Sequence, residues 1–228
     1  MSVQGDEIAA YYLNSRDEML SFLPATYGRV LEIGCGAGVF AANYPEDAES
    51  WGVEPSSAVD LARERFSRVL RGRYDEVEDQ IPDDYFDLVV CNDVIEHVPD
   101  HEVLLASLRR KLRGAGCLVA SVPNLRYIKA LFQLLVRKDW RYTDQGVLDR
   151  THLRFFTARS LRRSLEEQGY VLERFAGINS ALFKVRSPAS FAKALGCAML
   201  IAGSLGWQWD TQFHQLAFRA RRSDGGDR

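Results

Sequence analysis

A glycine-rich turn between two carboxylates carries the clearest chemical signal in this chain. Residues 30–38 read Val-Leu-Glu-Ile-Gly-Cys-Gly-Ala-Gly, which predicts a buried parallel strand followed by a tight turn into a helix. Because glycines have no side chain, a nucleotide-like ligand can approach the backbone of such a turn closely. Glu54 ends a second apolar run about 20 residues after the first glycine, a spacing at which a carboxylate binds ribose hydroxyls. These features predict a site for an adenosine-containing ligand.

The spacing of the glycines separates two classes of such ligand. A dinucleotide site uses G-x-G-x-x-G and places a pyrophosphate on the N-terminus of the helix. This chain has glycines at 34, 36 and 38, which is one residue too tight, and Glu32 stands two positions before them. A carboxylate there would repel a pyrophosphate, whereas it favours a ligand with an ammonium and a sulfonium group. The pattern disfavours a nicotinamide-dependent oxidoreductase, and a glycine turn without any ligand is the other alternative.

The arrangement resembles motif I of the class I S-adenosylmethionine-dependent methyltransferases. The run Cys91-Asn92-Asp93-Val94-Ile95-Glu96-His97-Val98 is similar to the fourth-strand motif of the branch that includes ubiquinone-biosynthesis O-methyltransferases. Residues 11–16, 121–127 and 148–156 resemble a bacterial subgroup associated with glycan biosynthesis. The resemblance covers nearly the whole chain and implies S-adenosyl-L-methionine as the cofactor.

The resemblance also implies which residues hold that cofactor. Glu32 and the glycine turn would hold its methionine and ribose part, and Glu54 would bind the ribose hydroxyls. Arg16 would pair with its carboxylate, for which a bidentate guanidinium is suited. The expected cofactor-binding residues are Tyr12, Arg16, Glu32, Gly34, Cys35, Gly36, Gly38, Glu54, Pro55, Asp75, Asn92 and Asp93.

The adenine end departs from the pattern of the subgroup. An acidic residue that reads the adenine amino group is usual where this chain has Arg73, which cannot accept that hydrogen bond. Asp75 is therefore expected to take the role, unless the role is lost. Pro55 would pack near the adenine, while Asn92 and Asp93 would lie beside the methyl donor.

Two histidines are candidates for the base. Methyl transfer to a hydroxyl needs alignment with the methyl carbon and profits from a general base, worth about 10²–10⁴ in rate. His97 follows the fourth-strand motif directly, but it could also be a helix-start histidine bonded to Glu96 or to backbone. His152 lies among charged residues, and an ionised neighbour there would make it a good base, although an ion-pair network would fix the loop equally well. We favour His152 and keep His97 as the second candidate.

The net charge of −2 conceals an asymmetry along the chain. Residues 1–125 contain 11 Lys and Arg against 22 Asp and Glu, a net −11, whereas residues 126–228 contain 18 against 9, a net +9. A basic second half favours an anionic partner, while solvated helix faces are the alternative. No nucleic acid and no metal ion are expected. The expected acceptor-binding residues are Asn124, Arg126, Tyr127, Arg150 and Arg154.

The elements that must position these residues alternate as βαβ units do. The resemblance implies an α/β, Rossmann-like seven-stranded sheet, mostly parallel with an antiparallel last strand, with helices on both faces and a helical insertion over the acceptor site. Residues 1–228 would form a single domain in which 124–156 and 179–211 are cap or insertion segments. The predicted helices are 8–22, 56–69, 101–112, 125–136 and 157–168, and the predicted strands include 86–91, 117–122, 170–178 and 212–218.

Composition agrees with one enzyme domain. The chain has 228 residues, of which 46% are hydrophobic and 26% charged, and its polar start predicts no secretory signal peptide. The four cysteines have no C-x-x-C spacing, which favours reduced thiols in a cytoplasmic protein.

An apolar segment over residues 191–207 is harder to interpret. It is too short to cross a bilayer, which needs about 20 apolar residues. A buried or dimer-forming helix is the favoured interpretation, and a peripheral contact with a membrane surface is the alternative.

The sequence therefore predicts an enzyme that transfers a methyl group from S-adenosylmethionine to an acceptor hydroxyl, on a sugar or glycan intermediate. An O- or N-methyltransferase of a small secondary metabolite is the first alternative. A non-catalytic cofactor-binding partner protein with the same fold is the second.

Overall fold

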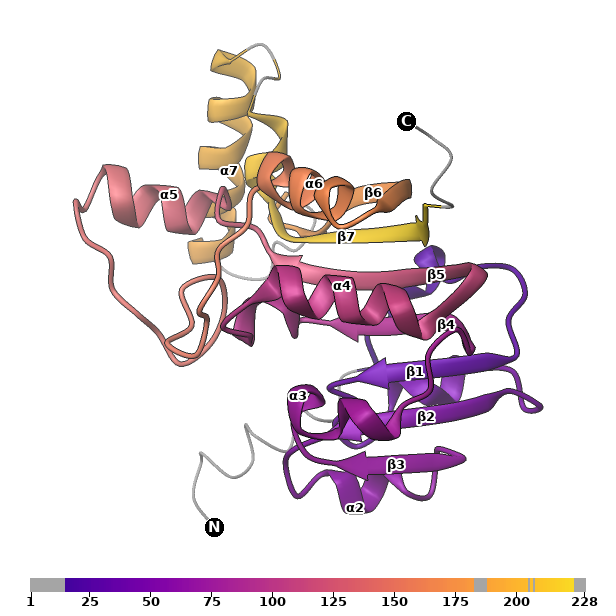
Figure 1. The fold of residues 1–228 in the computed structure, drawn as a ribbon. Coiled ribbons are helices and arrows are strands. Elements are labelled where there is room, and N and C mark those ends of the chain that lie inside the picture. Colours follow the sequence, from indigo (N-terminus) through magenta and orange to yellow (C-terminus); the bar gives the residue numbers. More distant parts are fainter. Residues whose placement is uncertain (1–14, 183–187, 205, 207, 224–228) are drawn as a thin grey trace.

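Seven strands form one sheet in the order β3-β2-β1-β4-β5-β7-β6 (Figure 1). The computed structural model describes residues 15–182, 188–204, 206 and 208–223. The strands are β1 (Arg29–Ile33), β2 (Glu49–Glu54), β3 (Arg68–Arg71), β4 (Phe86–Asn92), β5 (Leu112–Pro123), β6 (Tyr170–Ser180) and β7 (Phe213–Arg222). Strands β1 to β5 pair in parallel, whereas β7 runs antiparallel to both β5 and β6. The predicted mostly parallel sheet with an antiparallel last strand is confirmed.

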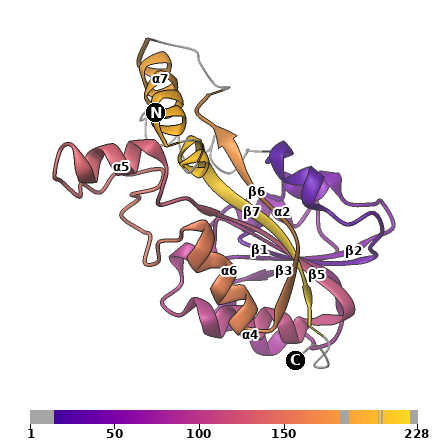
Figure 2. The same ribbon diagram turned by 90° about the horizontal axis from the view of Figure 1, so that it is seen from above.

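The helices and 3-10 turns lie on both faces and at one end of this sheet. The α-helices are α2 (Val59–Ala62), α3 (Tyr74–Val77), α4 (His101–Lys111), α5 (Ile128–Leu135), α6 (Ala158–Glu167) and α7 (Pro188–Gly203). The 3-10 helices are η1 (Asp17–Phe22), η2 (Phe40–Asn43), η3 (Glu78–Gln80), η4 (Ile95–His97) and η5 (Trp209–Gln212). Figure 2 shows α4 and α6 together on one face, and α5 and α7 beyond the edge at which the parallel strands end.

Alternate residues of the central strands build two separate cores. Leu31, Val89 and Leu118 point into the layer of α4 and α6, where Leu105 and Leu161 meet them. Their neighbours point to the opposite face, which is covered by η1 and η2: this second cluster contains Val30, Leu88, Val90, Val119, Met19, Phe22 and Phe40. Strands that are buried on both faces read as continuous apolar runs, which is why β1, β4 and β5 were recognisable in the sequence.

Three predicted helices are shorter in the structure. The predicted helix 56–69 is reduced to α2, because β3 begins at Arg68 and pairs with Trp51 of β2, so the connection cannot be one long helix. The helix expected after the glycine turn is the single 3-10 turn η2, since the chain must return to β2 at Glu49. Of the predicted helix 8–22, residues 17–22 form η1, and residues 8–14 lie outside the described part of the chain.

The two predicted insertion segments share a small core of their own. Buried Tyr127 and Ala130 of the first segment pack with Val147, and with Ala181 and Cys197 of the second. We use the name cap for residues 124–156 together with the described residues of 179–211. Within the described residues, no helix is long and apolar enough to cross a membrane.

Candidate functional site

The glycine turn has the backbone that its sequence predicts. Gly34, Gly36 and Gly38 have φ values of 71°, 53° and 76°, in the left-handed region that favours glycine. A Cβ on Gly34 would lie 2.6 Å from Val94 Cγ2, and one on Gly38 would lie 2.9 Å from Phe66 Cε2. These positions therefore need glycine both for conformation and for space.

Glu54 holds the turn together from the end of β2. Its side chain is 4% exposed, and its two carboxylate oxygens accept hydrogen bonds from the N–H groups of Gly36 and Ser56, both at 2.9 Å. A carboxylate offers about four lone pairs, so two remain for ribose hydroxyls. Glu54 can therefore stabilise the glycine turn and still bind ribose hydroxyls, as the sequence predicts.

Glu32 is buried beside the same turn. The hydroxyl of Tyr44 donates to Glu32 Oε2 at 2.6 Å, and the glutamate is 5% exposed. Burial raises the pKa of Glu32 from 4.5 to about 8, against the opposing effects of the Tyr44 hydrogen bond and the charge of Arg16. A cationic ligand group at this position would favour the ionised carboxylate.

Asp93 is a junction of four segments at the end of β4. Its carboxylate accepts from Arg16 Nη1 at 2.6 Å, from Ser121 Oγ at 2.8 Å and from Gln215 Nε2 at 2.5 Å. Burial alone would raise its pKa, but the charge of Arg16 and these hydrogen bonds outweigh burial and hold the pKa of Asp93 below its ordinary value. Next to it, the buried Oδ1 of Asn92 has no hydrogen-bond partner among the described residues.

Arg16 therefore lies close to the predicted site, with a partner that the sequence did not indicate. Its guanidinium donates to Asp93 and to Ser121 Oγ at 2.8 Å. Contact with a cofactor carboxylate stays a prediction and would require Arg16 to share or exchange these partners.

Glu96 is the least satisfied polar group of the site. It is 1% exposed, and in the described part of the chain neither of its carboxylate oxygens has a hydrogen-bond partner. Burial, followed by the charge of Asp93, raises its pKa well above the ordinary value. Burial therefore favours the neutral form of the Glu96 carboxyl group over the carboxylate.

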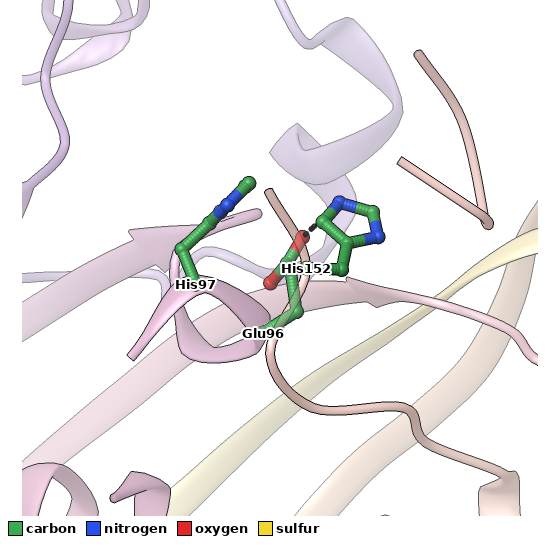
Figure 3. Close-up of side chains that lie close together, drawn as sticks. All are labelled: Glu96, His97 and His152. Atoms are coloured by element: carbon green, nitrogen blue, oxygen red, sulfur yellow. Dashed lines mark ion pairs between the residues drawn. The ribbon is translucent and has the colours of Figure 1, made fainter. Parts of the chain in front are cut away.

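Both candidate histidines lie next to Glu96 (Figure 3). His152 Nε2 is 4.0 Å from Glu96 Oε1, and the rings of His97 and His152 meet edge to face with centroids 4.8 Å apart. The Nδ1 atoms face the carbonyl oxygens of Val147 and Thr151, at 3.1 Å from His152 and 3.2 Å from His97. Because a carbonyl only accepts, both neutral rings carry their proton on Nδ1, which leaves each Nε2 as an acceptor.

Backbone hydrogen bonds bring these distant segments together. The N–H groups of Leu153 and Arg154 donate to the Glu96 carbonyl at 2.8 and 3.0 Å. The ligand atoms of Glu96, His97 and His152 all lie within 4.8 Å of one another, close enough to be tested as a metal site. Zinc would need bonds of about 2.0–2.2 Å to each of them, so the three groups would have to move closer together.

The predicted adenine contacts lie in exposed positions. Pro55 is exposed, and Asp75 is exposed and pairs with Arg73 Nε at 3.1 Å. Cys35 is buried, and burial raises the pKa of its thiol, which suits a backbone role. Tyr12 lies outside the described residues.

Most of the predicted acceptor residues are engaged within the cap. Asn124 is fully buried and donates to the carbonyls of Asp210 and Phe213, while Arg126 forms an ion pair with Asp210 at 2.6 Å. The Tyr127 ring packs on His214 with centroids 5.1 Å apart. Arg150 pairs with Asp144 at 2.7 Å, and Arg154 donates to the carbonyl of Pro99.

Two cavities open beside these residues. The larger has a volume of about 400 Å³, and the smaller, of about 50 Å³, is lined by Tyr127, Val147 and His214 among others. Sequence reasoning missed the partners Ser121 and Gln215 and gave Glu96 no role of its own. The position of Glu96 directly before His97 was a usable signal for a role at the site. Nothing in the sequence around Gln215 indicated its contact with Asp93.

Three comparisons place the fold and the sequence among known proteins. Residues 7–174 match the family described as methyltransferase domain. The ubiquinone biosynthesis O-methyltransferase of Aeromonas salmonicida is 27% identical over 163 residues, covering 67% of each chain. The mitochondrial enzyme of that name from Schizosaccharomyces pombe is 29% identical over 160 residues, covering 66% of this chain but only 57% of its own length. A SAM-dependent methyltransferase from Archaeoglobus fulgidus superposes with a TM-score of 0.64 at 20% identity, covering 94% of both chains.

Proposed function

The chain belongs to the S-adenosylmethionine-dependent methyltransferases, and from this premise we propose that it methylates an acceptor hydroxyl on a sugar or glycan intermediate. The observation that carries hydroxyl methylation is the pair of Glu96 and His152, which supplies an acceptor nitrogen beside the end of β4. The O-methyltransferases among its relatives also favour oxygen as the nucleophile.

The residues at the ends of β1 and β2 fit the cofactor. The left-handed glycine turn presents backbone without side chains at this position, and Glu32 and Glu54 add two buried carboxylates beside it. Glu54 would bind the ribose hydroxyls with its free lone pairs, while Glu32 would face the positively charged part of the ligand. Bound there, S-adenosylmethionine supplies a methyl group on a good leaving group.

His152 would act as the general base. His152 Nε2 would accept the proton of the acceptor hydroxyl while that oxygen takes the methyl group that bound S-adenosylmethionine would supply. The Val147 carbonyl holds the other ring nitrogen as N–H, which keeps Nε2 directed away from the backbone contact. The imidazolium that forms would lie about 4.0 Å from Glu96 and would favour ionisation of that carboxyl group. His97 is the second candidate, since its Nε2 is also an acceptor.

The cap would supply the acceptor pocket. Its smaller cavity is lined by Val147, whose carbonyl contacts His152, so an acceptor bound there would lie near the loop of the proposed base. The exposed apolar side chains of α7, Phe191, Leu195 and Met199, are candidates for the homodimer or peripheral membrane contact that the sequence predicts. A small secondary metabolite remains the alternative acceptor.

Calorimetry combined with a transfer assay tests the proposal. We expect saturable binding of S-adenosylmethionine and no binding of NAD at the same concentration. Labelled methyl groups should then appear on oxygen atoms of a sugar-containing extract fraction. Cofactor binding without transfer to any fraction would contradict catalysis and favour the non-catalytic alternative.

A further inference from the structure

Four of the nine residues that line the larger cavity of the cap are cationic. Its volume is about 400 Å³, within the usual range for small-molecule sites of about 300–1,000 Å³. It lies between α5 and the loop that follows, and its lining residues include Lys129, Arg137, Arg141 and Arg150. Two acidic residues, Asp139 and Asp144, also line it, so the charged lining has two more cations than anions.

Three of these cations have no acidic partner in the described structure. Arg150 is paired with Asp144 at 2.7 Å, but no ion pair or hydrogen bond of the Lys129, Arg137 or Arg141 side chain is found among the described residues. Arg137 lies 5.6 Å from the centre of the Phe132 ring, a contact that leaves its N–H groups available. Unpaired cations around one concave surface repel each other and are stabilised by an anion.

The larger cavity lies next to the smaller one, because the two share three lining residues. Lys129, Gln133 and Thr143 line both cavities. The smaller cavity is also lined by Val147, whose carbonyl accepts from His152 Nδ1 at 3.1 Å. A ligand held among the cations would therefore extend toward the loop that carries Val147 and His152.

We propose that the larger cavity binds the phosphate or diphosphate group of the acceptor, whose hydroxyl-bearing part extends through the smaller cavity toward His152. Guanidinium groups match phosphate oxygens with paired, charge-assisted hydrogen bonds, and two arginines with one lysine can neutralise a diphosphate. The inference rests on the proposed function and names the acceptor class. In this proposal the cations of the larger cavity, and not Arg126 and Arg154, contact the anion. The guanidinium groups of Arg126 and Arg154 already bind Asp210 and the Pro99 carbonyl.

Inorganic pyrophosphate is the probe for the test, with binding measured by calorimetry at low salt in the absence of any turnover. We expect saturable binding that weakens about tenfold when Arg137 and Arg141 are both replaced by alanine, as loss of charge-assisted hydrogen bonds predicts. Arg163→Ala is the matched control, because Arg163 is an exposed arginine of α6 that lines neither cavity. Affinity for S-adenosylmethionine should stay unchanged in all variants.

The outcomes separate this inference from the proposed function. No pyrophosphate binding, or equal binding by the double variant and the wild type, would overturn it even if methyl transfer were confirmed. Site-dependent pyrophosphate binding would support it even if no transfer were found. Competition by a nucleoside diphosphate sugar would indicate a soluble acceptor. Pyrophosphate-sensitive binding to phosphatidylcholine vesicles only when they carry a polyprenyl diphosphate would indicate a lipid-linked one.

Discussion

The two ends of the proposed site differ in how their buried carboxyl groups are hydrogen-bonded. We call the glycine turn with Glu32 and Glu54 the cofactor end, and Glu96 with His97 and His152 the acceptor end. At the cofactor end, Glu54 accepts two backbone N–H groups and Glu32 accepts from Tyr44, so both are held in place without a ligand. At the acceptor end, Glu96 is buried to the same degree, yet no hydrogen bond to its carboxylate oxygens is found in the described residues. An unpaired buried polar group costs about 1–3 kcal/mol, a cost that the proposed catalytic role beside two histidines would explain.

The largest effect should come from removing the proposed base. His152→Ala is expected to lower kcat by about 10²–10⁴ while the affinity for S-adenosylmethionine stays unchanged, because the proton acceptor is lost and the cofactor end is intact. Steady-state kinetics and calorimetry on the same preparation measure both quantities. His101→Ala is the control, since His101 contacts Ser164 on α6 and not Glu96. A larger loss for His97→Ala than for His152→Ala would transfer the role to His97.

The next effect concerns the carboxylate that holds the glycine turn. Glu54→Ala should weaken S-adenosylmethionine binding by about 1–3 kcal/mol, because two backbone N–H groups and the ribose would lose their acceptor. Glu49 is a matched control, since it lies on the same strand at the opposite edge and also accepts two hydrogen bonds, from Trp51 and Tyr85. Calorimetry should show wild-type affinity for Glu49→Ala. Wild-type affinity for Glu54→Ala would contradict the assignment of the cofactor end.

A pH-dependent effect on cofactor binding is expected from Glu32. Burial raises the pKa of Glu32 to about 8, so the carboxyl group is mostly protonated at pH 7, and binding of a cationic ligand should release its proton. The affinity for S-adenosylmethionine should therefore rise with pH below 8, by at most about tenfold per unit. Calorimetry in buffers of different ionisation enthalpy measures the released proton. Glu32→Gln should abolish the release.

The same raised pKa should make the stability of the unliganded protein fall as the pH rises, whereas the cofactor affinity rises. The raised pKa of Glu32 adds to the free energy of unfolding. This addition is fully present below pH 4.5 and is lost as the pH rises through about 8, because the folded chain keeps the proton up to a higher pH than the unfolded chain does. Denaturant unfolding of the unliganded protein should show a shallower decline over this range in Glu32→Gln. An identical decline in both proteins would show that Glu32 titrates normally.

The smallest effect is expected from metal removal. If the histidines work as free bases, dialysis against EDTA should leave kcat unchanged. Loss of activity that added zinc or manganese restores would instead identify Glu96, His97 and His152 as a metal centre.

The sequence by itself determined the cofactor end and most of the sheet. The glycine turn, Glu32 and Glu54 lie within residues 32–54, and their geometry follows from local rules: apolar runs buried on both faces, and a turn that only glycine can adopt. The capping of α6 by Thr157 was likewise predictable, because the residues involved are three positions apart. The predicted helix 56–69 was too long, since the pairing of β3 with β2 is a contact that local propensity does not contain.

Only the tertiary structure decided the acceptor end. Glu96 and His152 meet because the backbone of residues 153 and 154 bonds to the Glu96 carbonyl, and Asp93 is held by residues from the first and last parts of the chain. The cap likewise pairs Arg126 with Asp210 and leaves Arg137 and Arg141 at the larger cavity. Which of several similar arginines and histidines is paired depends on long-range packing, and a single sequence carries no periodic signal for such contacts.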